Sequence, residues 1–342
     1  MQSPSLQAST ARNIERWFRA HRRPLPWRER YDPWHVWVSE VMLQQTRMEV
    51  VLPYFARFTE RFPTLEACAK AAEEEVMAAW SGLGYYRRAR MLRAGAIEVL
   101  ERFGGAIPST VDELLTIPGI GRYTAGAIAS VAWNRRAPIV DGNVARILSR
   151  LFLIDEPVGS PALMRASWLA EEKLVAACKT PRDFNQGLME CGALICTPRK
   201  PSCERCPVRE HCLAFAAGRA DKLPRAKEKK ATRELRIPLY IVTDLRGRVL
   251  MRRESGPLMN AMYHLPHGDT SLRGGHAFDA KRGDLLGTFR HTVTDRRITF
   301  DVYAAALPSR VRDANDCSWI DPAEMQSVPH PSYVTKALLF MR

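Results

Sequence analysis

Residues 115–129, "LTIPGIGRYTAGAIA", decide the fold that this sequence predicts. Gly119 and Gly121 indicate a tight turn, and the small residues after them are typical of a helix. A dinucleotide-binding turn needs a strand before its glycines and a third glycine, but the preceding segment has a helical pattern and Thr124 stands at the third position. We expect a helix–hairpin–helix, whose backbone N–H groups bind a DNA phosphate. An ordinary tight turn between two helices is the alternative.

The composition is that of a soluble chain of two domains with excess positive charge. The 342 residues are more than one core usually needs, and no apolar run approaches the roughly 20 residues that span a bilayer. The first residues lack the apolar stretch of a secretory signal, so we expect a soluble cytoplasmic protein that does not bind membranes. A net charge of +14 favours nucleic acid as partner, with a solvated basic surface as the alternative.

The spacing of apolar residues along the chain changes near residue 221. Residues 1–220 show helical spacing of apolar residues, whereas strand-like alternation is scarce there. The segment 221–235, "DKLPRAKEKKATREL", is polar and charged and is expected to be a linker. Residues 236–342 contain strand and turn patterns, such as "IPLYIVTDLRGRVLMRRE" and "LLGTFRHTVTDRRITFDVYAAAL", and end in a helical pattern. We therefore expect a helical domain followed by a smaller α+β domain.

Four of the eight cysteines crowd into residues 196–212 in the pattern C-x6-C-x2-C-x5-C. They are Cys196, Cys203, Cys206 and Cys212. Four thiolates on one short loop can close round a single metal centre, whereas a secreted disulfide framework spreads its cysteines through a small chain. Two C-x-x-C pairs would favour zinc, but only one such pair is present. The cluster predicts metal ligation, with iron–sulfur and zinc as the possible centres.

The order of these motifs resembles that of the endonuclease III superfamily. A helix–hairpin–helix is followed by Asp141 in "PIVDGNVARIL" and then by the cysteine loop. Within the superfamily, "DPWHVWVSEVMLQQTRMEVVLPYFARF" and "WSGLGYYRRARML" look like the MutY family of adenine DNA glycosylases. The resemblance implies an all-α helix–hairpin–helix glycosylase domain with a [4Fe–4S] cluster on the four cysteines. It also implies a smaller α+β, Nudix-like domain for mismatch recognition.

Two carboxylates are the candidate catalytic groups. Glu40 stands in the apolar stretch "VSEVML", where burial would raise its pKa and keep it protonated near neutral pH. The resemblance implies that Glu40 protonates adenine at N7, that Asp141 stabilises the positive charge on the sugar, and that Asn143 orients this chemistry. Taken alone, a glutamate on an amphipathic helix is more often a surface residue.

Tyr123 stands where related lyases carry a lysine that forms a Schiff base with the sugar. A phenol cannot form an iminium ion with an aldehyde. The resemblance therefore implies a monofunctional glycosylase, which leaves an abasic site without cutting the strand. Tyr123 is expected to bond to the catalytic carboxylates or to stack near the extruded base, with simple packing as the alternative.

Further site residues follow only from the resemblance, and for most of them a role in the core or on the surface is the alternative. A base must leave the helix before it can be excised, and Gln44 and Tyr85 are expected to wedge into the base stack, with Gln45 as a further DNA-binding residue. The pocket for adenine is expected to consist of Trp27, Arg28, Leu43 and Gln186, the last of which contacts the edge of the base.

The second domain departs from the family pattern. Where the family usually has Phe-Ser-His to recognise the oxidised guanine, this chain has Val293, Thr294 and Asp295, and His291 lies nearby. The expected partner is double-stranded DNA with adenine opposite 8-oxoguanine or guanine, bound by a monomer. The alternatives are a glycosylase for thymine or damaged pyrimidines, and a non-catalytic iron–sulfur DNA-binding module.

Overall fold

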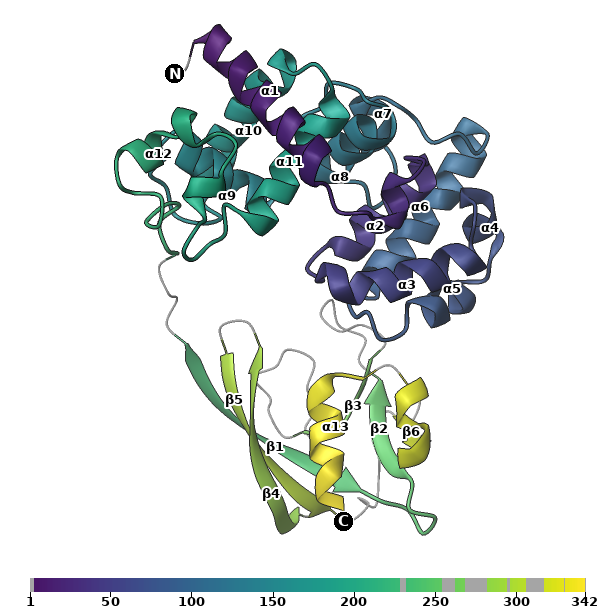
Figure 1. Ribbon diagram of the computed structural model, residues 1–342. Helices are drawn as coiled ribbons and strands as arrows, with labels where there is room; N and C mark the ends of the chain where they lie inside the picture. The colour runs from purple at the N-terminus through teal and green to yellow at the C-terminus, as the bar shows by residue number, and fades with distance from the viewer. Residues whose placement is uncertain are drawn as a thin grey trace. The chain divides into compact units, whose positions relative to one another are not determined.

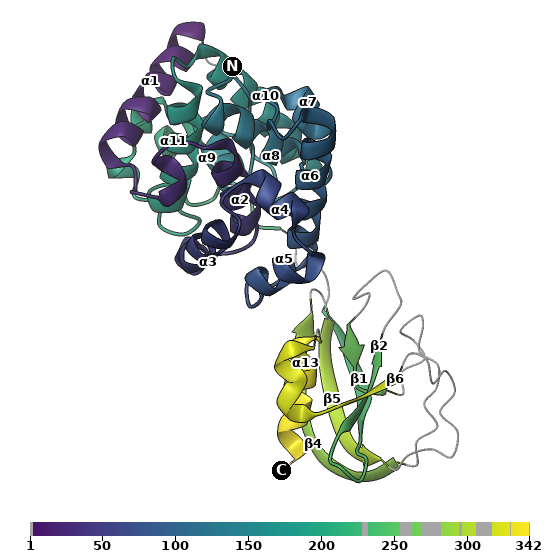
Figure 2. The ribbon, with the colours of Figure 1, turned by 90° about the vertical axis from the view of Figure 1, so that its right-hand side faces the viewer.

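The structure is a computed structural model that describes residues 3–227, 232–253, 262–267, 282–293, 296–305, 317–328 and 330–341. Contacts within the chain divide it into two compact units, Met1–Glu228 and Lys229–Arg342. The first unit is helical and the second is a smaller mixed α and β unit, as Figures 1 and 2 show. The fold class expected from the sequence is confirmed.

The first unit, here called the helical domain, consists of helices joined by short turns (Figure 1). The helices are α1 (Pro4–His21), α2 (Pro33–Leu43), α3 (Met48–Arg61), α4 (Leu65–Lys70), α5 (Glu73–Trp80), α6 (Arg87–Phe103), α7 (Val111–Leu115), α8 (Arg122–Ala127), α9 (Gly142–Leu151), α10 (Pro161–Ala177), α11 (Pro181–Leu194) and α12 (Leu213–Ala216).

Local side chains set where the functional helices begin. Helix α2 has proline at its first position, and the Asp32 carboxylate accepts a hydrogen bond from the His35 N–H at 3.0 Å. Helix α9 begins in the same way, with Asp141 accepting from the Val144 N–H at 2.7 Å. Side-chain caps of this kind satisfy N–H groups that lack partners within the helix. The candidate catalytic Asp141 is therefore also a helix cap, which fixes its position.

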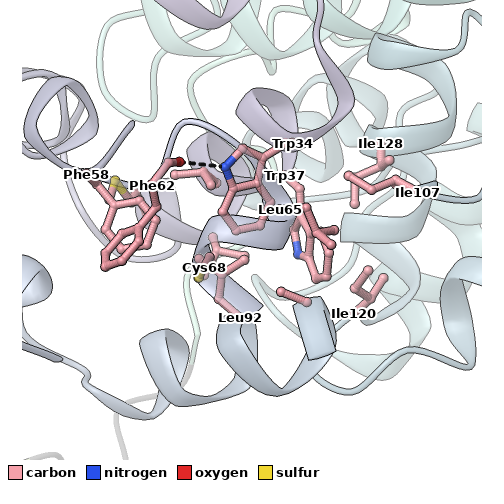
Figure 3. Packing of buried hydrophobic residues seen from close by; sticks show 14 of the residues in the cluster. Trp34, Trp37, Phe58, Phe62, Leu65, Cys68, Leu92, Ile107, Ile120 and Ile128 are labelled. Atoms are coloured by element: carbon pink, nitrogen blue, oxygen red, sulfur yellow. Dashed lines mark hydrogen bonds between the residues drawn. The ribbon is translucent and has the colours of Figure 1, made fainter. Parts of the chain in front are cut away.

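Two apolar clusters form the core of the helical domain. The first involves helices α2 to α6 and contains Trp34 and Trp37, which pack edge to face, as Figure 3 shows. The second joins α1 to helices α9, α10 and α11 and includes the fully buried Phe184. Helix α2 belongs to the first cluster, whereas Asp141 precedes a helix of the second. The candidate site therefore lies where the two clusters meet.

Helices α7 and α8 and the turn between them form the expected hairpin. Gly119 has a φ of +83°, and a Cβ atom there would lie 2.8 Å from the Cβ of Met91. Both the left-handed backbone and the close approach of α6 require glycine at this position. Gly121 is the N-cap of α8, which continues into a short π-helical turn at Ile128–Ala132.

The ends of the segment expected to be a linker belong to the two units. Leu223 is buried, and Arg225 forms a backbone bridge to Pro157 in the helical domain. At the other end, strand β1 (Arg233–Val242) begins two residues before the expected end of the linker. The structured parts of the two units are therefore separated by fewer residues than the composition predicts.

The second unit contains two small sheets. In the first, β1 pairs in parallel with β5 (Arg296–Ala305), which pairs antiparallel with β4 (Arg282–Val293). In the second, β2 (Val249–Arg253) pairs antiparallel with β3 (Tyr263–His264) and β6 (Cys317–Ile320). The hairpin expected around residue 294 is confirmed by the pairing of β4 with β5.

The first strand–turn–strand pattern of this unit does not form a regular hairpin. Strands β1 and β2 belong to different sheets and share only the isolated bridge between Thr243 and Val249. Strand β1 instead pairs with β5 in a ten-residue register, and β2 pairs with β3 and β6. Helix α13 (Ser332–Leu338) contributes Tyr333 and Val334 to the core of this unit.

Among the described residues, no helix is long and apolar enough to cross a membrane.

Candidate active site and cysteine loop

Glu40, Tyr123 and Asp141 come together although they lie on different elements. Glu40 is on α2, is only 7% exposed, and is flanked by the buried Val41. Burial raises the pKa of Glu40 to about 7; a hydrogen bond with the Tyr123 hydroxyl partly offsets this, and the nearby charge of Asp141 adds to it. The Tyr123 hydroxyl also lies 3.1 Å from the sulfur of Met189. The sequence expectation of a buried glutamate with a raised pKa agrees with this geometry.

Asp141 is held by hydrogen bonds from its own helix. Besides the bond from Val144, its second oxygen accepts from the Asn143 Nδ2 at 3.2 Å. Burial raises the pKa of Asp141, and the N–H groups of Val144 and Asn143 lower it in part. Asp141 and Glu40 thus share a low-dielectric site but differ in their hydrogen-bond partners, which is an arrangement that separates an acid from a charge stabiliser.

A chain of hydrogen bonds runs from Asp141 to the cysteine loop. Arg146 donates to the Asn143 Oδ1 at 2.8 Å and to the carbonyl oxygen of Gly192 at 2.8 Å. Its Nε donates to the carbonyl oxygen of Cys196 at 2.7 Å. Arg146 therefore orients the Asn143 side chain, which in turn orients the Asp141 carboxylate.

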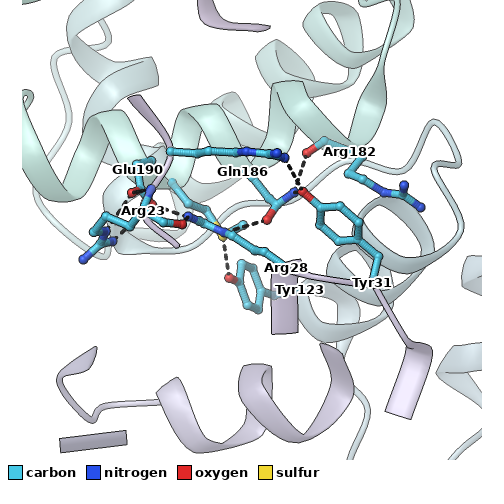
Figure 4. Close-up of polar contacts among 9 residues, drawn as sticks. Arg23, Arg28, Tyr31, Tyr123, Arg182, Gln186 and Glu190 are labelled. Carbon is cyan, nitrogen blue, oxygen red and sulfur yellow. Dashed lines mark hydrogen bonds and ion pairs between the residues drawn. The ribbon is translucent and has the colours of Figure 1, made fainter. Parts of the chain in front are cut away.

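Arg28 and Gln186 lie in a buried polar network, which Figure 4 shows. The Arg28 Nε donates to the Gln186 Oε1 at 2.9 Å, and its Nη2 forms an ion pair with Glu190 at 2.9 Å. Glu190 also pairs with Arg23, and its carboxylate is nearly inaccessible to solvent. Because the positive charge of Arg28 lies near Glu40, it lowers the pKa of that carboxyl slightly.

The amide nitrogen of Gln186 also has hydrogen-bond partners. Its Nε2 donates to the carbonyl oxygen of Arg182 at 3.2 Å and lies 3.4 Å from the hydroxyl of Tyr31. The Arg182 guanidinium stacks over the Tyr31 ring, with the central carbon 4.2 Å from the ring centroid. These contacts fix which end of the Gln186 amide faces Arg28 (Figure 4).

Two residues expected in the base pocket lie in the core. Trp27 is 5% exposed and packs edge to face against Phe55. Leu43, at the end of α2, is partly buried and packs on the same apolar cluster. Both side chains therefore pack mainly in the interior, as tryptophan and leucine usually do.

Five expected DNA-contacting residues line one open pocket of about 580 Å³. They are Gln44, Gln45, Tyr85, Gly119 and Gly121. The pocket also contains Trp37, Arg87, Arg88 and Met91, so it joins the end of α2, the start of α6 and the hairpin. Tyr85 is 65% exposed, so much of its side chain faces solvent beside this pocket.

The four cysteines of residues 196–212 surround a second, smaller pocket that Arg150 also lines. The Arg150 Nη1 lies 3.2 Å from the sulfur of Cys196 and donates to the carbonyl oxygen of Thr197, Nη2 donates to that of Pro198, and Nε donates to that of Leu223. In the described part of the chain, no three His, Cys, Asp or Glu side chains are arranged to hold a single metal ion. Four sulfurs around a pocket, with a buried cation beside them, fit a negatively charged iron–sulfur cluster.

In the second unit, His291 and Val293 lie on β4, opposite Ile298 and Arg296 of β5. The His291 ring lies beside the Tyr333 ring, with centroids 6.1 Å apart, and burial lowers the pKa of His291. Thr294 and Asp295, which complete the expected recognition segment, lie outside the described residues.

Sequence reasoning missed three charged residues that organise these sites: Arg88, Arg146 and Glu190. The two arginines were visible only as part of the general positive charge. Glu190, a single acid within the apolar stretch "GLMECGAL", could have been noticed as a buried ion-pair partner. Their roles depend on backbone carbonyls and distant partners, which a sequence does not display.

The fold is that of the helix–hairpin–helix class of DNA repair proteins. Residues 38–170 match the model of the HhH-GPD superfamily of base excision DNA repair proteins. Residues 196–212, bounded by the first and last cysteine of the loop, match the iron–sulfur binding domain of endonuclease III. The chain thus carries the binding loop of a [4Fe–4S] cluster, and the iron–sulfur prediction is confirmed over zinc.

Curated relatives identify the family more closely. The chain is 44% identical to an adenine DNA glycosylase of Rattus norvegicus, over 62% of this chain and 43% of the relative. It is 33% identical to an adenine DNA glycosylase of Buchnera aphidicola subsp. Schizaphis graminum, over 76% of this chain and 75% of the relative. The chain belongs to the adenine DNA glycosylase family. It spans less than half of the length of the rat and human relatives that it matches.

Solved structures agree on the fold of the helical domain. A thermostable thymine-DNA glycosylase is 30% identical, with a TM-score of 0.55, over 62% of this chain and 98% of its own. A non-covalent endonuclease III–DNA complex is 22% identical, with a TM-score of 0.51, over 64% of this chain and 99% of that chain. The second of these supports the fold alone.

Proposed function

We propose that this protein is a monofunctional adenine DNA glycosylase. It removes adenine mispaired with 8-oxoguanine or guanine, by base flipping and hydrolysis of the N-glycosidic bond. The observation that carries the proposal is the buried Glu40 carboxyl, whose pKa is raised to about 7 beside Asp141 and Tyr123. A group with this pKa is partly protonated at neutral pH and still gives up its proton readily, as general acid catalysis requires.

The chemistry uses the two carboxyl groups differently. As the bond between the base and C1′ breaks, the protonated Glu40 gives its proton to N7 of the departing adenine. The sugar then carries positive charge, which the Asp141 carboxylate stabilises. Water adds to C1′ and gives a proton to the Glu40 carboxylate, which restores the acid. Asn143 keeps the Asp141 carboxylate oriented through the hydrogen bond at 3.2 Å.

Tyr123 supports the assignment of a glycosylase without lyase activity. It hydrogen-bonds to Glu40 but has no amine to attack the C1′ aldehyde of an abasic site. We therefore expect intact strands after base removal and no adduct after borohydride treatment. Efficient strand cleavage by β-elimination would contradict this part of the proposal.

The remaining assignments concern binding. Arg28 and Gln186 provide polar groups for the adenine pocket, and Trp27 and Leu43 form its apolar wall. Gln44 and Tyr85 enter the base stack, Gln45 binds DNA beside them, and the turn at Gly119 and Gly121 binds a backbone phosphate. The four cysteines ligate the [4Fe–4S] cluster, which holds the loop in shape. One copy of the chain binds one mispair.

The second unit is proposed to be Nudix-like and to recognise the base opposite adenine. Val293, Thr294, Asp295 and His291 are the candidate contacts. Because the family's Phe-Ser-His is absent, we expect the preference for 8-oxoguanine over guanine to depend on His291 and Thr294. Equal single-turnover rates on the two duplexes would show that this unit does not discriminate between them.

Single-turnover excision from a panel of duplexes tests the proposal. The panel contains adenine opposite 8-oxoguanine, adenine opposite guanine, and thymine opposite guanine. Glu40→Gln and Asp141→Asn are each expected to slow adenine removal by about 100-fold or more, because each removes a group that acts in the transition state. The exposed Glu60→Gln on α3 is the matched control and is expected to behave as the unchanged protein.

Three outcomes of that panel would overturn the proposal. Removal of thymine in place of adenine would favour a thymine glycosylase, which the likeness to the thermostable thymine-DNA glycosylase makes the second candidate. Binding without excision of any base would favour a non-catalytic module. Full activity in both carboxylate variants would remove the mechanism.

A further inference from the structure

Arg88, in the first turn of α6, holds together two segments that lie far apart in the sequence. The segments are 44–47, which follows α2, and 81–86, which follows α5. The Arg88 guanidinium donates hydrogen bonds to the carbonyl oxygens of Val41 (3.0 Å), Met42 (2.9 Å), Gln44 and Gly84 (3.2 Å) and to the hydroxyl of Thr46 (3.2 Å).

Three of these acceptors belong to the carboxyl end of α2. The last carbonyl groups of a helix have no partners within the helix and form the negative end of its dipole. Arg88 satisfies them with one nitrogen and neutralises that end with its charge, just beyond the turn that carries Glu40. A planar guanidinium can do this and still reach a second segment, whereas the point charge of lysine cannot.

The same guanidinium organises segment 81–86. Its central carbon lies 5.6 Å from the ring centroids of both Tyr85 and Trp80. The Trp80 Nε1 donates to the Gly84 carbonyl oxygen, which Arg88 also contacts, at 3.2 Å. Tyr85 is 65% exposed, so Arg88 orients a ring that has little apolar packing of its own.

Both segments carry a residue with an unusual backbone. Gln45 has a φ of +57° and Tyr85 a φ of +51°. A left-handed backbone is strained for a residue other than glycine and persists only where surrounding contacts impose it. Gln45, Tyr85 and Arg88 line the same pocket, and Arg88 contacts both segments.

We propose that Arg88 is a positioning residue that makes segments 44–47 and 81–86 act as one rigid wedge, which replaces the extruded base in the DNA stack. The inference rests on the proposed function. Without Arg88, Gln44 and Tyr85 would each sample several orientations, and the energy of binding would no longer be available to open the base pair. Arg88 would then act on extrusion of the base and leave the chemistry of Glu40 unchanged.

The test measures base extrusion apart from excision. A duplex carries 2-aminopurine, whose fluorescence rises when it leaves the stack, opposite 8-oxoguanine. Glu40→Gln is introduced in all proteins so that the base is not removed. Arg88→Met and Arg88→Lys are compared with Arg93→Met, which removes a partly buried arginine of the same helix that donates to the carbonyl oxygen of Ala71 at 2.8 Å.

At saturating protein, we expect the fluorescence increase to fall by about 10-fold in both Arg88 variants and to be unchanged in Arg93→Met. Among proteins with Glu40 intact, excision by Arg88→Lys is expected to recover when the adenine is placed in an unpaired bulge, where extrusion costs less. A normal fluorescence increase in Arg88→Lys, an equal loss in Arg93→Met, or no recovery on the bulged substrate would overturn the proposal. Thermal melting and cluster absorbance show whether each variant is folded, and Arg88→Lys is the variant on which the test depends if Arg88→Met unfolds.

Failure of the proposed function would give a different result. If the unchanged protein excises no adenine but still extrudes 2-aminopurine, the glycosylase proposal fails and the role of Arg88 is decided by the fluorescence alone. If excision is normal and independent of Arg88, only the wedge proposal fails.

Discussion

The Nε of Arg146 donates a 2.7 Å hydrogen bond to the backbone carbonyl oxygen of Cys196, the first cysteine of the iron–sulfur loop. The same guanidinium holds Asn143, which in turn holds Asp141. The loop is therefore connected to a candidate catalytic carboxylate through two side chains.

The first prediction concerns this connection. Arg146→Met is expected to slow single-turnover excision by about 10- to 100-fold, the usual cost of losing an orienting partner near a metal site. It is also expected to speed the loss of cluster absorbance during incubation with a chelator. Arg102→Met, which removes an exposed arginine paired with Glu98, is the control. Normal excision together with a normally stable cluster would show that the connection has no functional role.

The second prediction concerns pH. The pKa of Glu40 is raised to about 7, mainly by burial, and the hydrogen bond from Tyr123 lowers it. The protonated form is the acid, so the single-turnover rate should fall as pH rises through about 7. Tyr123→Phe removes the bond that stabilises the carboxylate, so the falling part of the profile should move to higher pH. A shift to lower pH would contradict the assignment of Glu40 as the acid.

The third prediction concerns the ion pairs of Glu190. Glu190→Gln leaves the buried Arg28 without its carboxylate, and breaking a buried pair in this way typically costs about 3–5 kcal/mol. Asp183→Asn on the same helix is the control, because its partner Arg19 is largely exposed and such pairs contribute about 0–1 kcal/mol. Urea unfolding measures both. Equal losses in the two variants would contradict the special role of the buried pair.

Glu190 also has a consequence in acid. Burial would raise its pKa, but the hydrogen bonds from Arg23 and Arg28 outweigh burial, and the folded-state pKa lies below the usual value. The stability that the pair contributes is therefore present at neutral pH and is lost as pH falls through the folded-state pKa. Glu190→Gln should remove this part of the acid sensitivity.

The fourth prediction concerns Glu171 on α10. It is fully buried, neither of its carboxylate oxygens makes a hydrogen bond of normal geometry, and burial raises its pKa well above the usual value. The unfolded chain loses this proton near pH 4.5 but the folded chain keeps it, so the folded state should lose stability as pH rises above that value. Glu171→Gln should melt higher than the unchanged protein at pH 8 by a few degrees, or about 1 kcal/mol, and nearly equally at pH 5.

The control for this prediction is Glu172→Gln. Glu172 is the next residue of the helix, is exposed, and pairs with Arg122 at the surface. Its substitution should change the melting temperature little at either pH. If Glu171→Gln destabilises the protein equally at pH 5 and pH 8, the carboxyl is not neutral in the folded state.

The sequence alone determined those features that depend on local spacing. The helix–hairpin–helix follows from two glycines between helical segments, and the metal site follows from four cysteines within 17 residues. The apolar neighbours of Glu40 along α2 indicated that its pKa could be raised, but its burial beside Tyr123 and Asp141 depends on the tertiary structure. The turn and the cysteine spacing depend only on residues close together in the sequence, so they can be predicted without the fold.

Only the tertiary structure decided which distant groups meet. Arg88 reaches the end of α2 across more than forty residues, and Arg28 pairs with Glu190 across more than 160. The pairing of β1 with β5, which lies more than fifty residues further along the chain, likewise joins segments far apart in the sequence. The acceptors of Arg88 and Arg146 are mostly backbone carbonyls, which every residue carries. Because such acceptors leave no signature in the sequence, the roles of these arginines could be assigned only from the tertiary structure.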